Sequence, residues 1–306
     1  MKKTILVYVP LISILIIAAC ASDKPTVAVK QNARHAEGRA LESYHRGDME
    51  QAIFYFKRAL EQDQSVNNLP GIAADLHNLA RCYVNLGLDD NARKVLSEAI
   101  EINNTIENRS GTADNYVLLA TVRMRREDYE AAMDLLNKSY SLYEEDKNRV
   151  GMATALNNMG SIYLKQGLYD QAFTTIDDSI AMHEKEKNHG GLAAAYNNFG
   201  YLHELRGNPE RAIEYYLLSL KEDKFIENSF GISSDLHTIA EFYKNSGDFE
   251  NALFYYKRAS EVNRRLNLTT RLRDDLQNII DILASMGREE ERQLYEQALQ
   301  DLELIL

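Results

Sequence analysis

The sequence predicts an all-α protein built from about seven copies of one helix-turn-helix unit. A short motif returns every 40 residues, and apolar residues at helical spacing flank each copy. Its copies are GDMEQA at 47–52, GLDDNA at 87–92, EDYEAA at 127–132, GLYDQA at 167–172, GNPERA at 207–212, GDFENA at 247–252 and a weaker GREEER at 287–292. A fixed repeat of this kind stacks into one elongated solenoid rather than into separate globular domains.

Each side of the motif predicts one amphipathic helix. In the first helix of the fourth copy, from about 152 to 165, apolar or small residues recur at i, i+3, i+4 and i+7, starting at Leu156. The second helix starts after Gly167 and carries Ala172 and Ile176 four residues apart. The two spacings therefore predict a pair of helices that each bury one face.

Small residues recur at one fixed place in each helix and predict where the two helices of a pair touch. The first-helix column is Ala40, Ala80, Ala120, Gly160, Gly200 and Ala240. The second-helix column is Ala52, Ala92, Ala132, Ala172, Ala212 and Ala252. Small side chains let two backbones approach closely. Arg292 replaces the alanine in the last copy, which suits a terminal unit that packs on one side only.

Glycine marks the expected turns. One column stands where the first helix must stop, as expected for residues with positive φ, and comprises Gly47, Gly87, Gly167, Gly207, Gly247 and Gly287. Asp48, Asn208 and Asp248 follow as expected N-caps of the second helix. A second column is expected to end each second helix and comprises Gly71, Gly111, Gly151, Gly191 and Gly231. Glu127 replaces the turn glycine in the third copy.

These residues resemble the tetratricopeptide repeat. The family pattern of an aromatic residue or Leu, then Leu-Gly, Tyr, Gly and Ala is met by Leu156, Met159-Gly160, Tyr163, Gly167 and Ala172. The usual family period is about 34 residues. The extra length here falls mainly in the second helix and the turn after it. The resemblance implies a right-handed α-solenoid over residues 31–306, with units at about 31–70, 71–110, 111–150, 151–190, 191–230, 231–270 and 271–306.

The N-terminus predicts a lipid anchor. Lys2 and Lys3 precede an apolar run that is too short to span a bilayer comfortably. The run ends in Ile17-Ala18-Ala19-Cys20, which resembles the bacterial lipobox. The resemblance implies a signal peptide at 1–19, lipid (palmitate) on Cys20 and a tether at 20–30. An ordinary secretory leader with an incidental cysteine remains the alternative.

The same resemblance bears on location. In the lipoprotein sorting pattern, Asp directly after the cysteine retains a protein in the inner membrane, and Ala21 stands there instead. We therefore expect the chain in the bacterial cell envelope, on the outer membrane and facing the periplasm.

Composition excludes several classes of function. The formal net charge is −11, whereas a nucleic-acid binder is expected to show a basic face. Two cysteines, Cys20 and Cys82, cannot form a disulfide framework or a zinc site. Cys82 falls inside a helix beside Tyr83, which predicts a buried and unreactive thiol.

Asparagine recurs on the first helices at positions that line a concave groove in the tetratricopeptide family. These candidates for binding a partner are Asn78, Asn157, Asn158, Asn197 and Asn198. Asparagine disfavours helix interiors, so its repetition calls for a reason. A carboxamide both donates and accepts hydrogen bonds, so it can bind the backbone of an extended peptide. The alternative is that these asparagines are solvated or join one helix to the next.

A cationic set forms a second candidate. Arg81, Arg125 and Lys165 lie on first helices and would bind a carboxylate or an acidic peptide. The alternative is that they pair with Glu or Asp across a solvated face. Val117 and Leu118 would either form a pocket for one hydrophobic side chain or belong to the core.

No catalytic motif occurs, and the sequence predicts a non-catalytic protein without cofactor or metal site. We expect a membrane-anchored scaffold that binds a segment or helix of a partner protein in the groove. Similar lipoproteins assist assembly of pili and secretins or scaffold peptidoglycan enzymes. A receptor for a small ligand, such as a short peptide or cell-wall fragment, is the alternative. Self-association through the terminal units is a third possibility.

Overall fold

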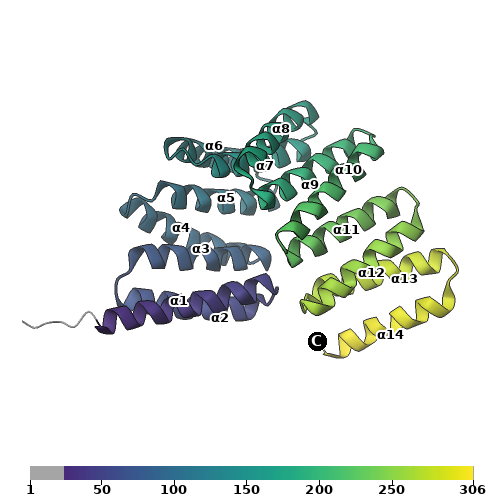
Figure 1. Ribbon diagram of the computed structural model, residues 1–306, viewed down its shortest axis with the longest axis horizontal. Helices are drawn as coiled ribbons and strands as arrows, with labels where there is room; N and C mark the ends of the chain where they lie inside the picture. Colours follow the sequence, from purple (N-terminus) through teal and green to yellow (C-terminus); the bar gives the residue numbers. More distant parts are fainter. Residues whose placement is uncertain (1–23, 306) are drawn as a thin grey trace, which may run out of the picture.

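The computed structural model describes residues 24–305, which form 14 α-helices and no strand (Figure 1). None of these helices is both long and apolar enough to cross a bilayer. The helices are α1 Lys24–His45, α2 Met49–Ser65, α3 Leu69–Asn85, α4 Asp89–Thr105, α5 Arg109–Arg125, α6 Tyr129–Glu145, α7 Arg149–Lys165, α8 Tyr169–Glu186, α9 His189–Leu205, α10 Pro209–Phe225, α11 Ser229–Asn245, α12 Phe249–Arg265, α13 Thr269–Ser285 and α14 Glu289–Ile305.

Each odd-numbered helix packs most extensively on the even-numbered helix that follows it, from α1–α2 through α11–α12, and each pair packs on the next. The predicted all-α solenoid of about seven units is confirmed. The odd-numbered helices also contact one another in the middle of the stack, from α3 to α9. We call the surface that they form the inner face and the surface of the even-numbered helices the outer face.

The first helix begins earlier than the sequence predicted. Residues 24–30, predicted to belong to a tether, lie in α1. Nothing after Pro25 interrupts the helix, because the stretch TVAVKQNARHAE holds neither glycine nor proline. The half-buried side chains of Val29 and Lys30 extend the packed face that continues at Ala33.

The turns inside the units are as predicted. Their six glycines have φ between +69° and +81°. Glu127 takes the same left-handed conformation at +59°, although its side chain makes this costlier than for glycine. Asp48 and Asp248 cap the following helices by accepting from the backbone N–H three residues on, whereas Asn208 makes no such side-chain bond.

The second glycine column was wrongly predicted to end the even-numbered helices. These glycines lie inside the odd-numbered helices, at the third position. The residues with positive φ between units are Asn67, Glu107, Lys147, Lys187, Glu227 and Asn267. The glycines instead make room for the last buried side chain of the preceding even-numbered helix. A Cβ at Gly151 would lie 2.3 Å from Cδ1 of Tyr143.

The small residues hold the two helices of a pair together. All six alanines of the second-helix column are fully buried. A Cβ on Gly160 in α7 would lie 2.4 Å from Cγ1 of Ile176 in α8, so the backbones are in close contact there. In the same pair, the Ser179 hydroxyl donates to the Ala153 carbonyl at 2.8 Å. The predicted packing role of these columns is confirmed.

The stack curves until its first and last units approach each other (Figure 1). The turn between α1 and α2 lies against the turn between α12 and α13, since a Cβ on Gly47 would fall 2.2 Å from Cδ2 of Leu268. Leu268 is the N-cap of α13, a place held by asparagine in the five preceding units: Asn68, Asn108, Asn148, Asn188 and Asn228. We call this contact the closure contact.

Candidate functional site

One mostly polar row runs along the inner face, with one residue at the same place in each odd-numbered helix from α3 to α13. This inner row comprises Asn78, Leu118, Asn158, Asn198, Thr238 and Asn278, all of them half-buried. Between α3 and α5 it borders a cavity of about 200 Å³ that Asn78 lines together with His77 and Asp114. The row therefore offers side chains that are held by the fold and still reach solvent.

The residues one position earlier join consecutive units. His77 Nδ1 lies 2.9 Å from Asn115 Oδ1, and His237 Nδ1 lies 2.7 Å from Asp275 Oδ1. Asn197 donates to Asp235 at 3.5 Å. We call this column, which also holds Glu37, Val117 and Asn157, the joining column. Asn197 therefore fits the alternative in which the groove asparagines join one helix to the next.

Asn157 belongs to the same joining column. Only 8% of its surface is exposed, and its side-chain oxygen accepts a hydrogen bond from Asn198 Nδ2 at 2.9 Å. Asn198 Nδ2 also donates to Ser161 Oγ at 2.8 Å. The two predicted residues therefore form one hydrogen-bonded cluster between α7 and α9.

Three of the five predicted asparagines lie in the inner row, and each of these keeps hydrogen-bonding capacity. Asn158 donates to the Thr154 carbonyl at 2.8 Å and Asn78 accepts from Arg81 at 3.3 Å. Among the described residues, no hydrogen bond involves the side-chain oxygen of Asn158, the side-chain oxygen of Asn198 or the side-chain nitrogen of Asn78. A carboxamide has two donors and two acceptor sites, so each side chain has groups left to bind a partner.

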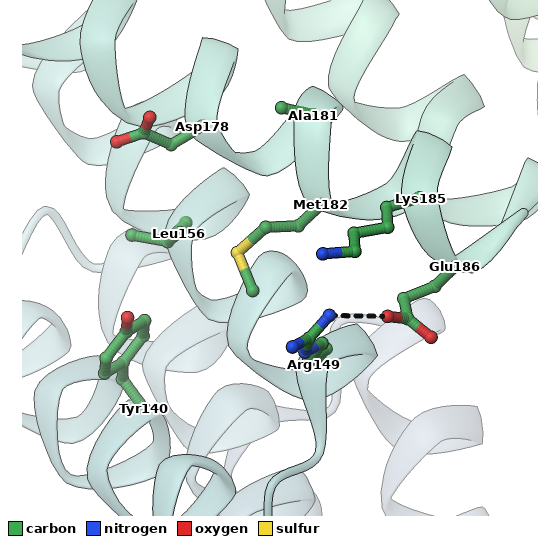
Figure 2. A pocket seen from close by; sticks show the side chains of 8 residues that line it. All are labelled: Tyr140, Arg149, Leu156, Asp178, Ala181, Met182, Lys185 and Glu186. Atoms are coloured by element: carbon green, nitrogen blue, oxygen red, sulfur yellow. Dashed lines mark ion pairs between the residues drawn. The ribbon is translucent and has the colours of Figure 1, made fainter.

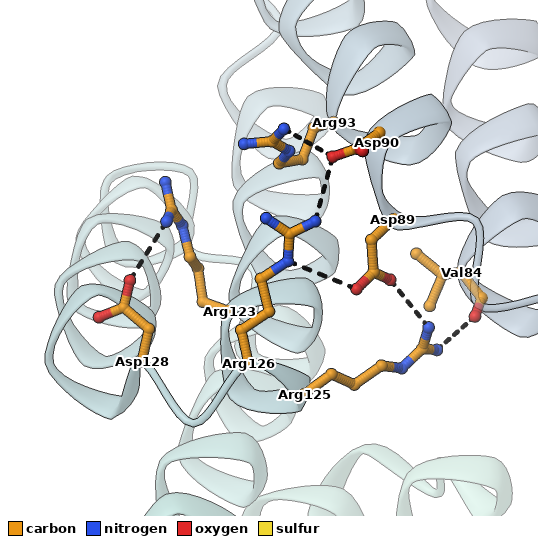
Figure 3. Close-up of polar contacts among 8 residues, drawn as sticks. All are labelled: Val84, Asp89, Asp90, Arg93, Arg123, Arg125, Arg126 and Asp128. Atoms are coloured by element: carbon orange, nitrogen blue, oxygen red, sulfur yellow. Dashed lines mark hydrogen bonds and ion pairs between the residues drawn. The ribbon is translucent and has the colours of Figure 1, made fainter.

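The three predicted cations each face a different group rather than one another. Arg81 lies with its guanidinium carbon 4.5 Å from the centroid of the Tyr44 ring. Arg125 bonds the Val84 carbonyl and pairs with Asp89 at 3.1 Å (Figure 3). Lys165 is exposed, 5.9 Å from the Tyr201 ring centroid.

Figure 3 places Arg125 in a larger set of ion pairs at the turns of the second and third units. Arg126 reaches both Asp89 and Asp90, and Arg93 reaches Asp90 at 2.7 Å. The pairs that Arg125 and Arg126 form with these acids link the turns of the two units, and ion pairs this accessible to solvent are weak. The structure therefore gives Arg125 the pairing role that stood as the alternative.

The apolar residues of the third unit divide between core and inner row. Val117 packs against the core around Ala120, Leu136 and Met159. Leu118 is half-buried in the inner row between its asparagines. The inner face therefore offers one apolar contact, at Leu118, rather than a two-residue pocket.

A larger cavity lies elsewhere and was missed by the sequence analysis. It measures about 490 Å³ and opens on the outer face between α6 and α8, where Tyr140, Met182 and Lys185 line it (Figure 2). Arg149 and Glu186 form an ion pair at its edge, with 3.6 Å between their atoms. Such a space arises where two even-numbered helices diverge, and no residue pattern signals it.

The structure describes only one of the two cysteines. Cys20, the predicted lipidation site, and the predicted signal peptide lie outside the described residues. Cys82 is fully buried, and burial raises the pKa of its thiol to about 11. The thiol is therefore protonated at neutral pH, in agreement with the predicted unreactive role.

Comparison with protein families decides the class. A profile described as tetratricopeptide repeat matches residues 33–105, 72–145 and 151–221, and a second profile with the same description matches 236–265. The chain belongs to the tetratricopeptide repeat family. A comparison with curated protein sequences finds no match.

Solved structures show the same fold at low sequence identity. A Rap protein complexed with competence and sporulation factor is 17% identical with a TM-score of 0.66, over 89% of this tetratricopeptide-repeat chain and 75% of that one. Aspartyl phosphate phosphatase F from Bacillus subtilis is 18% identical with a TM-score of 0.62, over 92% and 73%. The apo form of RapI is 14% identical with a TM-score of 0.57, over 89% and 97%.

Proposed function

We propose that this protein is a binding scaffold that holds an extended segment of a partner protein along its inner face. The observation that carries the proposal is the inner row, in which half-buried carboxamides with spare hydrogen-bonding groups recur at one place per unit. Side chains that are partly buried lose less rotamer freedom when they bind, so they are suited to hold a ligand.

The spacing of the row suits a peptide backbone. Packed helices lie about 8–10 Å apart, and an extended chain advances about 3.3 Å per residue. Carboxamides on successive odd-numbered helices would therefore meet the backbone roughly every third residue. Leu118 adds one apolar contact between Asn78 and Asn158. This pattern favours binding through the backbone of the peptide, with limited preference for its sequence.

Two further elements of the proposal come from outside the described structure. Cys20 would anchor the solenoid by lipid to the envelope, with the outer membrane favoured, so the inner face would receive a partner of that compartment. Assembly of pili or secretins, or of peptidoglycan machinery, is the process we propose. The similarity in fold to a Rap protein that was solved in complex with competence and sporulation factor supports the use of this fold for binding.

A small-ligand receptor is less well supported. The alternative rested on Arg81, Arg125 and Lys165 acting together, and the contacts of the three side chains diverge. A small anion bound by the three would need Arg125 to leave Asp89.

The test is partner capture by the full lipidated chain. In-cell crosslinking and mass spectrometry identify the partner, and its affinity is then measured for Asn78→Ala combined with Asn158→Ala. Two lost hydrogen bonds of about 1 kcal/mol each weaken binding more than about tenfold. The matched control is Asn91→Ala combined with Asn137→Ala, two exposed asparagines of the outer face. Equal affinity in both double variants contradicts the proposal.

A further inference from the structure

Three columns of side chains meet at the junctions between consecutive units. The joining column comes from the odd-numbered helix, a second column ends the following even-numbered helix, and a third lies in the next odd-numbered helix. The last junction shows the arrangement: Asp275 receives His237 Nδ1 on one oxygen and Asn263 Nδ2 on the other, each at 2.7 Å. A buried carboxylate there has a partner on each of its oxygens.

Another junction also supplies donors to its acid. Between the fifth and sixth units, Ser219 Oγ donates to Asp235 at 2.8 Å, and Asn197 donates to the same oxygen. Where the third column is Ala155 or Ala195, no acid needs a partner. At the later junctions the third column thus holds either a residue that is not an acid or an acid that accepts from donors, on both oxygens in Asp275 and on one oxygen in Asp235.

The first junction departs from this pattern because all three residues are carboxylic acids. Glu37 on α1, Asp63 on α2 and Asp75 on α3 place an oxygen each within 4.8 Å of one another. Asp63 is 2% exposed and Asp75 is fully buried. Three acids from three helices converge on one point, whereas no other junction carries more than two, Asp223 and Asp235 between the fifth and sixth units.

The buried carboxylate of Asp75 indicates a ligand independently of this clustering. Neither of its carboxylate oxygens has a hydrogen-bond partner among the described residues, although both are buried. A buried polar atom without a partner destabilises the fold, and more so when it is charged. Asp63 by contrast accepts from Asn68 Nδ2 at 2.9 Å.

The surrounding charges do not neutralise Asp75. Glu37 and Asp63 are the charged groups that act on it, and both are acidic, while Arg34 acts on Glu37. Burial first, and then the two neighbouring carboxylates, raise the pKa of Asp75 to about 8.

We propose that Glu37, Asp63 and Asp75 bind one calcium ion that links the first two units. Carboxylate oxygens are the ligands that calcium prefers, at about 2.3–2.6 Å, so two oxygens on one ion lie up to about 5 Å apart. The three oxygens lie within 4.8 Å of one another, which is within the reach of one calcium ion. Glu37 is half-buried, which leaves one side open for water ligands.

This site departs from the expectation of no metal site drawn from the sequence. Residues 37, 63 and 75 form no compact motif, and only the superposition of three columns brings them together. Because three side chains and solvent provide few ligands, we expect weak binding, in the range of about 10⁻⁴–10⁻³ M found for extracellular calcium modules.

The experiment is thermal unfolding of the full chain with EDTA or with 10 mM CaCl₂. At about ten times the dissociation constant, calcium is expected to raise the melting temperature by about 3 °C. Asp75→Asn, which copies Asn115 at the next junction, is expected to remove this shift. Asp235→Asn, the equivalent change at a junction whose acid has donors, is expected to keep it.

Two results would overturn the proposal: no calcium-dependent shift in the wild-type chain, or the same shift in Asp75→Asn. If Asp75→Asn does not fold, Glu37→Gln serves in its place, since Gln277 stands at the equivalent position of the last unit. Titration calorimetry of the wild type is expected to give one site per chain. These outcomes concern the first junction and do not depend on partner binding at the inner row.

Discussion

Asn157 and Asn158 are neighbours in α7, yet their side chains have different surroundings. Asn157 is nearly buried and accepts a hydrogen bond from the next unit, whereas Asn158 is half-buried and bonds only its own helix. Asn197 likewise donates to Asp235 of the next unit, while the half-buried Asn198 donates to Asn157 of the neighbouring unit and also reaches solvent. At the residue scale, the joining column makes contacts between units, whereas the inner row holds side chains that still reach solvent.

The contact that the joining column makes at the last junction can be tested at Asp275, the acceptor of His237. Replacement by alanine leaves His237 and Asn263 without their shared acceptor in a fully buried place. We expect Asp275→Ala to lower the free energy of unfolding by about 3 kcal/mol, measured by chemical denaturation. The adjacent Asp274 is exposed, so Asp274→Ala is expected to cost no more than about 0.5 kcal/mol. Similar losses for the two variants would contradict the assigned role.

The sequence predicted the candidate asparagines but not which column joins the units. Both columns hold asparagine, and adjacent positions on a helix differ by only about 100° in direction. The partner of each side chain lies about 40 residues away, as Asn157 and Asn198 show. That distance hides the contact from local patterns, and it also hid the convergence of Glu37, Asp63 and Asp75.

At the scale of the helix pair, the sequence was more informative. The small residues at Gly160 and Ala172 predicted the contact between α7 and α8, because close approach of two helices restricts residue size at fixed positions. The positive φ at Gly167 followed from the same local logic. The role of Gly151 was predicted wrongly, because this glycine makes room for the Tyr143 ring of a neighbouring helix.

The pairing of Gly160 with Ile176 gives a prediction for this element. The third unit has Ala120 opposite Leu136 at the same two places. Gly160→Ala places a methyl group against Cγ1 of Ile176, so we expect a loss of about 1–3 kcal/mol, although alanine favours a helix. Adding Ile176→Leu reproduces the pair of the third unit and is expected to restore the stability.

Thermal unfolding of the two variants checks this. A single variant as stable as the wild type would show that the helices are not in tight contact. A double variant no more stable than the single one would show that the two positions are not coupled.

At the scale of the whole molecule, the curvature of the stack brings the first unit to the sixth and seventh. The sequence could not predict this curvature, because it sums small rotations between units. One substitution nevertheless marks it: Leu268 replaces the capping asparagine where the closure contact forms. Loss of a cap costs about 1 kcal/mol, which the packing of Leu268 on Gly47 offsets.

The closure contact predicts a change of shape in Gly47→Asn. Asparagine tolerates the left-handed conformation, but its Cβ would lie 2.2 Å from Leu268. We expect a larger radius of gyration in small-angle scattering, as the ends separate. Gly247 has nearly the same φ of +81° with nothing within 4 Å of an added Cβ, so Gly247→Asn is the matched control. An unchanged radius in both variants would show that the ends do not touch.

The central claim is that the inner face binds the partner. The most direct measurement is site-specific photocrosslinking in cells, with benzoylphenylalanine in place of Asn158 in one chain and in place of the outer-face Asn137 in another. We expect a defined crosslinked partner from position 158 and none from position 137. A partner that crosslinks from 137 and not from 158 would contradict the account.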